Sequence, residues 1–442
     1  SDMFKLLRNA FKVEEVRKKL IYTFLMLLVI RFGSVLPIPG VNTSYFADLF
    51  KSLSSSDAFG WFNTMTGGSF TDLSVFALSI TPYITSSIIM QLLTVAIPKL
   101  EELQKDGEEG RKKIAEYTRY VTVVLALIES AAMAIGFGGS GLLYNYNVGS
   151  IIVCIVTMTT GSALLMWIGE RITENGVGNG ISVVLLFNIL SSLPDDLGSL
   201  YTTFIRNENV AVGVVMAVII IACVAAMVVF AIVLNDATRN IPVQYSRKMQ
   251  GRRLVGNGQS VIPLKVNTAG VIPVIFASSI MSVPTMIAQF LNVDYSSIGG
   301  KILLLLNSGN WCRPDGYTWA NIGLVIYLVL IILFAYFYTS ITFNPLEVAN
   351  NMKKSGGFIP GMRPGKQTSD YLNRILSYII LIGAAGLCII AFVPILVSGV
   401  FGLGHLSFLG TSLLIIVAVV IETVKQIESQ LLVRNYKGFL NN

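Results

Sequence analysis

Charge is scarce in this chain, and its scarcity decides the class of protein. Charged residues make up 13% of the 442 residues, against 53% hydrophobic residues, and the mean hydropathy is +0.69. A soluble domain of this length would need far more charge on its surface. The composition therefore predicts an integral membrane protein.

Chemistry-bearing patterns are also missing. The chain holds one histidine, His405, and its four cysteines show no pairing or metal spacing, so we expect free thiols. It has no phosphate-binding loop, zincin pattern or nucleophile elbow. Only Arg31 and Glu129 lie well inside apolar stretches, where structural pairing is the more common role of such residues. The sequence therefore predicts no enzyme, no metal and no cofactor.

Long apolar stretches fill most of the remaining sequence. Each is about as long as a helix that crosses a bilayer and reads as a continuous run, without the alternation of a barrel strand. Only a helix satisfies its own backbone polar groups in lipid. We therefore predict an all-α polytopic protein with ten spans, near residues 20–36, 75–97, 120–136, 151–168, 181–193, 210–234, 269–291, 322–340, 375–396 and 407–424.

Lysine and arginine collect on one side of these predicted spans. They precede the first span and follow the second, sixth and eighth, whereas the opposite loops hold only Lys51, Arg206, Lys301 and Arg313. The positive-inside rule then places both termini and the basic loops in the cytoplasm. Topology accounts for most of the net charge of +7, although contact with ribosomal RNA is an alternative source of basic loops.

Two further segments interrupt the apolar pattern. The loop 343–367 is basic and rich in proline and glycine, which indicates a docking surface outside the lipid. The segment 59–70 is apolar but too short to cross, so it is either a re-entrant half-helix or an amphipathic helix on the outer leaflet. The pairs Ile80 with Ile84 and Ile181 with Leu185 each share a helical face, and periodicity leaves open whether they face lipid, helices or a pore.

A set of local motifs occurs in order along the whole chain. It includes Thr81-Pro82-Tyr83-Ile84, Gly178-Asn179-Gly180-Ile181-Ser182, Pro263-Leu264-Lys265-Val266-Asn267 and the loop 343–367, together with segments 31–40, 62–68, 112–120, 167–174 and 250–253. With these motifs the chain closely resembles the SecY family, the channel subunits of the bacterial Sec translocon.

The resemblance implies an hourglass channel of two inverted five-helix halves. Residues 1–19 would be a cytosolic amphipathic segment, 20–193 the first half, 194–209 an external hinge loop, 210–424 the second half with cytosolic loops 235–268 and 341–374, and 425–442 a cytosolic tail. The pore ring would comprise Ile80, Ile84, Ile181, Leu185, Ile275 and Ile415. A plug near 59–71 would include Gly60, Trp61, Phe62, Asn63, Met65, Gly67 and Gly68.

The same resemblance implies a function and partners. The channel would translocate unfolded secretory proteins across the bacterial cytoplasmic membrane and release transmembrane segments into lipid through a lateral gate that includes Gln91, Asn267 and Val271. The SecA ATPase or the ribosome would bind to five basic residues, Arg252, Arg253, Arg363, Lys353 and Lys354. SecE and SecG subunits, signal sequences, nascent polypeptides and membrane lipids would be the other partners. The alternative is an ion-coupled secondary transporter with inverted repeats.

Overall fold

The fold is taken from a computed structural model of the chain. It describes residues 2–53, 70, 72–206, 209–246, 248–250, 253–255, 259–290, 294–307, 310–401 and 409–440. The predicted plug residues from Gly60 to Gly68 and the single histidine, His405, lie outside the described residues.

A helix occupies each of the ten predicted windows. Six helical segments in the described part are long and apolar enough to cross a membrane, and a seventh is obtained if α5 and α6 (Pro98–Lys105), bent by 102°, count as one span. The ten helices are α2 (Glu14–Val35), α5 (Thr81–Ala96), α7 (Glu108–Phe137), α8 (Val148–Asn175), α9 (Gly180–Phe204), α10 (Val210–Asp236), α11 (Ile272–Phe290), α13 (Asn321–Thr342), α15 (Lys366–Phe401) and α16 (Leu409–Leu440).

Several helix ends differ from the predicted windows, and three of them change the predicted organisation. The start of the second window is turn rather than helix, because α5 begins at Thr81 with Pro82 in its first turn. Helix α9 continues past Pro194 to Phe204, into the segment predicted as a hinge loop, since Leu200 packs on Leu413 of α16. Helix α16 continues to Leu440, so the predicted tail is mostly helical.

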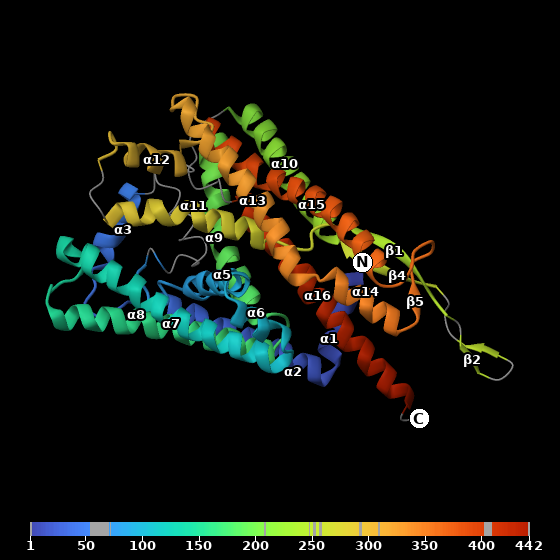
Figure 1. Cartoon of the computed structure of the whole chain (residues 1–442). Helices are drawn as coiled ribbons and strands as arrows, with labels where there is room; N and C mark the ends of the chain where they lie inside the picture. Colours follow the sequence, from blue (N-terminus) through green and yellow to red (C-terminus); the bar gives the residue numbers. More distant parts are fainter. Residues whose placement is uncertain are drawn as a thin grey trace.

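Shorter helices connect and flank these spans. They are α1 (Asp2–Lys12), α3 (Thr43–Leu53), α12 (Ile298–Leu306) and α14 (Pro345–Lys354), with a π-helical turn at Gly138–Leu142 and a 3-10 turn at Thr318–Ala320. In Figure 1, α2, α7 and α8 lie together on one side and α10, α13 and α15 on the other. Helices α5 and α9 lie between them.

A small antiparallel sheet joins two distant loops, which helix-period reasoning did not predict. Strand β1 (Thr238–Tyr245) pairs on one edge with β4 (Gln259–Lys265) and on the other with β5 (Gly357–Phe358). Ile241 and Val243 of β1 pack with Met352, Ile359 and residues of α15 in one buried cluster. The loops after the sixth and eighth spans therefore form one packed unit, on the side of the molecule where both chain ends lie (Figure 1).

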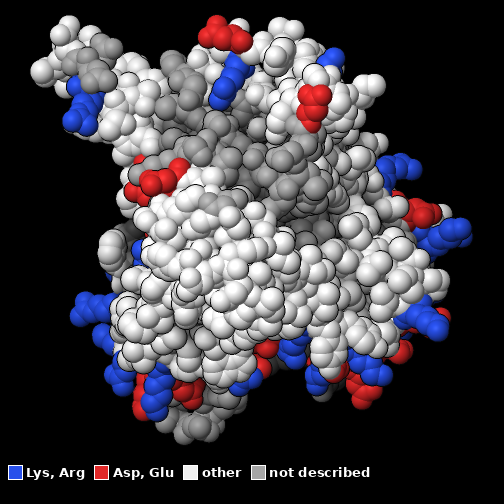
Figure 2. Space-filling model, turned by 90° about the vertical axis from the view of Figure 1, so that its left-hand side faces the viewer, with Lys and Arg blue, Asp and Glu red and all other residues white. Residues whose placement is uncertain are grey.

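Charged side chains avoid much of the surface. Figure 2 shows a face whose middle carries almost no charge, with lysine, arginine, aspartate and glutamate at its margins. Helix α10 exposes a continuous apolar surface, on which Val218 is 61% and Ile221 is 69% accessible. Only 11% of its most apolar window is buried inside the chain, so lipid or other subunits must cover this helix.

Candidate functional site

An apolar cluster lies where four helices from distant parts of the sequence meet. Ile84 of α5, Leu185 of α9, Ile275 of α11 and Ile415 of α16 belong to this cluster, which we call the constriction cluster. Leu185, Ile275 and Ile415 are at most 6% exposed. Removing a side chain of this size from water is worth about 1.5–3 kcal/mol, so these residues favour a dry meeting point.

The two other predicted ring residues lie next to the constriction cluster. Ile80 and Ile181 belong to a neighbouring cluster that also contains Ile84, so Ile84 links the two groups. The structure thus brings all six predicted ring residues into one continuous apolar region. Sequence reasoning missed the other buried members of the constriction cluster, Ile88, Ile189, Phe276 and Val419. These residues follow the predicted ring residues at helical spacing or adjoin them.

The start of α9 is fixed by close backbone packing. The side chain of Asn179 caps the helix by accepting a hydrogen bond from the Ile181 amide at 3.2 Å. At Gly180 a Cβ atom would lie 1.7 Å from the carbonyl oxygen of Gly169 in α8, so only glycine allows this approach. Ile181 and Leu185 are therefore held in place by the turn that precedes them.

A buried polar group holds the irregular backbone just before α5. Ser79 has a left-handed backbone with φ of 49°. Its carbonyl oxygen accepts a hydrogen bond from the Ser162 hydroxyl at 3.0 Å, and its hydroxyl accepts one from the Asn188 side chain at 3.1 Å. Non-helical backbone at membrane depth requires such partners. The sequence signal was Asn188 within an apolar stretch, which the prediction did not use.

The predicted gate residues lie in different surroundings. Gln91 of α5 lines a cavity of about 240 Å³ between α5, α6, α7 and α13, together with Ser87, Thr94, Gln104, Arg111 and Ile341 among others. The Gln91 Oε1 atom is buried and accepts no hydrogen bond from the described residues. Asn267 donates to the Asn235 side chain at 3.1 Å, near the end of α10. Val271 packs against the constriction cluster.

The predicted docking residue Arg363 lies in a rigid turn. Gly361 and Gly365 on either side have φ of 83° and 107°, a conformation that favours glycine. The Thr368 hydroxyl donates to the Arg363 carbonyl oxygen at 2.9 Å, and Ile359 anchors the turn in the core under the sheet. The backbone is thus fixed while Arg363 itself is exposed.

The other predicted docking residues are spread over the same side of the molecule. Lys353 and Lys354 are exposed in the last turn of α14, where cations are favoured by the helix dipole. Arg253 begins β3 (Arg253–Val255), which forms a hairpin with β2 (Lys248–Gln250). In Figure 1 this hairpin projects away from the three-stranded sheet. Arg252 lies outside the described residues.

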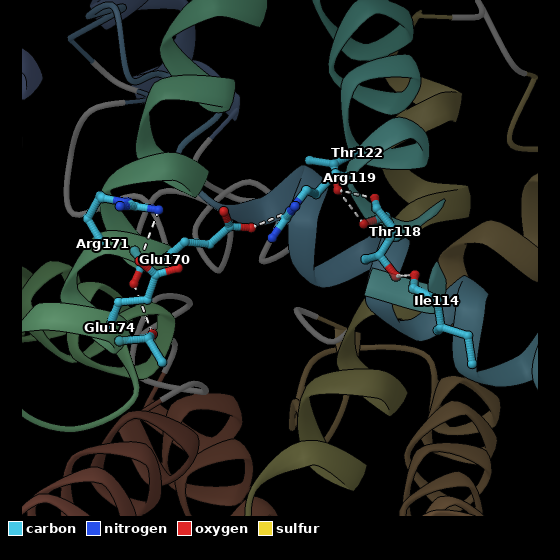
Figure 3. A network of polar contacts seen from close by, with 10 residues as sticks. Ile114, Thr118, Arg119, Thr122, Glu170, Arg171 and Glu174 are labelled. Carbon is cyan, nitrogen blue, oxygen red and sulfur yellow. Dashed lines mark hydrogen bonds and ion pairs between the residues drawn. The ribbon is translucent and has the colours of Figure 1, made fainter. Parts of the chain in front are cut away.

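Polar contacts tie α5, α7 and α8 together (Figure 3). Arg119 of α7 donates to Glu170 of α8 at 2.7 Å. The hydroxyls of Ser86 in α5 and Thr122 in α7 lie 2.6 Å apart, and Thr122 also donates to the Thr118 carbonyl oxygen. Glu170 therefore has a structural partner. Among the described residues, no three His, Cys, Asp or Glu side chains are grouped to hold a metal ion.

Comparison with known proteins identifies the family. The SecY family model matches residues 74–424. The SecY subunit of the protein translocase of Halalkalibacterium halodurans is 40% identical over 99% of this chain and 100% of its own length. The chain belongs to the SecY family. The corresponding subunits of Bacillus subtilis and Streptomyces scabiei are 41% and 42% identical, over at least 98% of both chains.

Solved structures extend the SecY likeness to the fold. A structure described as a protein conducting channel matches with a TM-score of 0.61 and 18% identity, covering 93% of this chain and 92% of that one. Sec61 from a canine ribosome–channel complex matches with a TM-score of 0.56 and 17% identity, over 93% and 92% of the two chains. At these identities the likeness concerns the fold alone, and this chain has the SecY fold.

Proposed function

We propose that this chain is the protein-conducting channel subunit of a Sec translocon in the bacterial cytoplasmic membrane. The observation that carries the proposal is the constriction cluster, which collects Ile84, Leu185, Ile275 and Ile415 from four helices in a SecY-family chain. A narrow apolar constriction excludes water and ions, while flexible aliphatic side chains can deform around a passing polypeptide. Membership in a family of translocase subunits supports this function over an ion-coupled transporter.

The energy for translocation would come from a partner. The basic side with Arg363, Lys353 and Lys354 would face the cytoplasm with both termini and would bind the SecA ATPase or the ribosome. The turn around Arg363 supports this role, because its fixed backbone presents an exposed arginine, which pairs well with carboxylate or phosphate. Fold relatives include Sec61 from a canine ribosome–channel complex and a yeast Ssh1 complex bound to the ribosome. SecE and SecG would cover exposed apolar helices such as α10.

The remaining channel parts follow from the same proposal. Signal sequences and nascent transmembrane segments would leave for lipid between the halves, passing Gln91, Asn267 and Val271. The segment near residues 59–71 would be the plug that closes the resting channel on the external side. These assignments rest on the family resemblance and on the location of Gln91 in a cavity lined by α5, α7 and α13.

Reconstitution tests the proposed function directly. The chain, combined with small partner subunits and a SecA ATPase from a close relative, is expected to move a secretory precursor into proteoliposomes, where it becomes protected from protease, only when ATP is present. A stalled precursor carrying one cysteine should crosslink to Leu185→Cys or Ile415→Cys, and not to the matched control Leu190→Cys, which is 44% exposed on another face of α9. Crosslinking to Leu190→Cys alone, or ion-coupled solute uptake by the chain alone, would overturn the channel assignment.

A further inference from the structure

Helix α1 presents an apolar stripe that the described part of the chain leaves largely uncovered. Phe4 is 84%, Leu7 37% and Phe11 52% exposed, and their spacing of three and four residues places them along one face. The chain buries only the neighbouring face, where Ala10 is 0% exposed and Leu6 packs beside it. Large aromatic side chains exposed together on a short helix indicate that something outside this chain covers them.

A row of cations borders this stripe. Lys5, Arg8 and Lys12 repeat at the same three- and four-residue spacing and are all exposed. None of the three is in an ion pair with a described residue within 4 Å. An apolar stripe next to a cationic stripe is the pattern of helices that lie in the headgroup region of a membrane.

The backbone places α1 across the neighbouring span. Val13 between α1 and α2 has an extended conformation, with φ of −85° and ψ of 119°, which breaks the helix. In Figure 1, α1 runs across the direction of α2, close to α16. Leu6 and Ala10 hold it there against Ile427 and Leu431 of α16. Because α1 turns away from α2 where that span ends, its axis is directed along a membrane surface and not through the membrane.

We propose that α1 is a surface anchor that lies in the acidic headgroup region of the leaflet at the end of α2. Phe4, Leu7 and Phe11 enter the acyl boundary, and Lys5, Arg8 and Lys12 contact acidic phospholipid headgroups. Each such cation near an acidic leaflet favours the bound position by roughly fivefold. The anchor goes beyond the proposed channel function, because it requires only that the chain is embedded in a membrane.

Fluorescent labels at single cysteines test this placement in the full chain. The label NBD is attached to Phe4→Cys, Phe11→Cys or the matched control Asn9→Cys, in a chain whose native Cys154, Cys223, Cys312 and Cys388 are replaced by alanine. The protein is inserted into nanodiscs of phosphatidylcholine with 30% phosphatidylglycerol, or of phosphatidylcholine alone. In the acidic nanodiscs we expect at least threefold weaker iodide quenching at positions 4 and 11 than at position 9.

Charge variants separate acidic lipid from other causes of protection. K5Q/R8Q/K12Q is expected to raise iodide quenching at positions 4 and 11 towards the value in neutral nanodiscs. The matched triple R111Q/K112Q/K113Q, at exposed cations of α7, should leave it unchanged. A quencher on lipid acyl chains should reach positions 4 and 11 and spare position 9, and size-exclusion profiles check that each variant is folded.

Three outcomes would overturn the anchor. Equal iodide quenching at positions 4, 9 and 11 in acidic nanodiscs would show that the stripe remains in water. Protection that is identical in neutral nanodiscs and survives K5Q/R8Q/K12Q would refute the role of acidic lipid. Protection that develops only when another subunit is added would assign the stripe to a protein partner. None of these measurements depends on translocation activity. The anchor can therefore be confirmed or refuted whether or not the channel proposal is correct.

Discussion

Substitution of Leu185 by asparagine tests whether the constriction cluster seals the channel. Leu185 is 6% exposed and packs with Ile275 and Ile415. Loss of the buried leucine removes about 1.5–3 kcal/mol of transfer free energy. An unpaired amide in its place costs about 1–3 kcal/mol more. The dry, closed arrangement is therefore disfavoured by about 2.5–6 kcal/mol relative to the native protein.

Water is the partner that the new amide lacks. Hydration of the constriction recovers the hydrogen-bonding part, about 1–3 kcal/mol, and shifts the ratio of hydrated to dry channels by about fivefold to 150-fold. Leu185→Asn is therefore expected to leak potassium from proteoliposomes at a rate at least several times that of the native channel. Leu185→Ile conserves volume and should remain sealed.

The assay measures potassium release from loaded proteoliposomes. A control sample treated with valinomycin defines the maximal release. Leu190→Asn on the exposed face of α9 is the matched variant and should not leak. Thermal unfolding in detergent checks that each variant is folded. If folded Leu185→Asn is as tight as the native protein, Leu185 does not line the seal, and the assignment of the constriction cluster as the pore ring is refuted.

Three other substitutions test separate parts of the structure. Gly161→Ala should lower the free energy of unfolding by about 1–3 kcal/mol, because the new Cβ would lie 2.0 Å from the carbonyl oxygen of Val75. Gly198→Ala is the matched variant: its Cβ meets no atom within 4 Å, so it should raise the free energy of unfolding by about 0.5–1 kcal/mol. Thermal unfolding in detergent measures both changes. Glu129→Gln should raise the free energy of unfolding by about 1 kcal/mol, because a neutral amide costs less to bury than a carboxylate with one oxygen that has no hydrogen-bond partner among the described residues. A decrease on thermal unfolding would reveal a role for the carboxylate. Arg363→Glu should reduce ATPase-driven import several-fold without changing the melting temperature. The control is Lys113→Glu, at an exposed cation of α7 outside the docking loop, and equal import by both variants would contradict docking at Arg363.

The spans could be predicted from the sequence because lipid imposes a strong, local constraint. Twenty apolar residues in a row leave the backbone few options other than a helix. Helix ends were less predictable. The fifth predicted window ended at residue 193, yet Leu200 finds a buried site against Leu413 of α16, and this tertiary contact carries α9 on to Phe204. Such a contact joins residues more than two hundred positions apart and leaves no local signal.

The constriction cluster was predictable only with the help of the family resemblance. The spacing of Ile181 and Leu185 identifies a shared helical face but not what that face contacts. The polar support at Ser79 was missed altogether, because serine and asparagine in an apolar stretch are compatible with many partners. Its two bonds reach Ser162 in α8 and Asn188 in α9, so they depend on the fold as a whole.

The three-stranded sheet changes how the basic surface can act on the channel. As separate loops, the segments after the sixth and eighth spans would move independently. A partner that displaced Arg363 would then move only its own loop and would not displace the other loop or the helices. In the structure, β5 adjoins Arg363's turn and pairs with β1, which pairs along its length with β4. Strand β4 ends at Lys265 and leads through Asn267 and Val271 into α11, which carries Ile275 of the constriction cluster. A partner that displaces the turn at Arg363 therefore pulls on a hydrogen-bonded sheet, and that sheet is attached by a short covalent segment to one wall of the proposed pore.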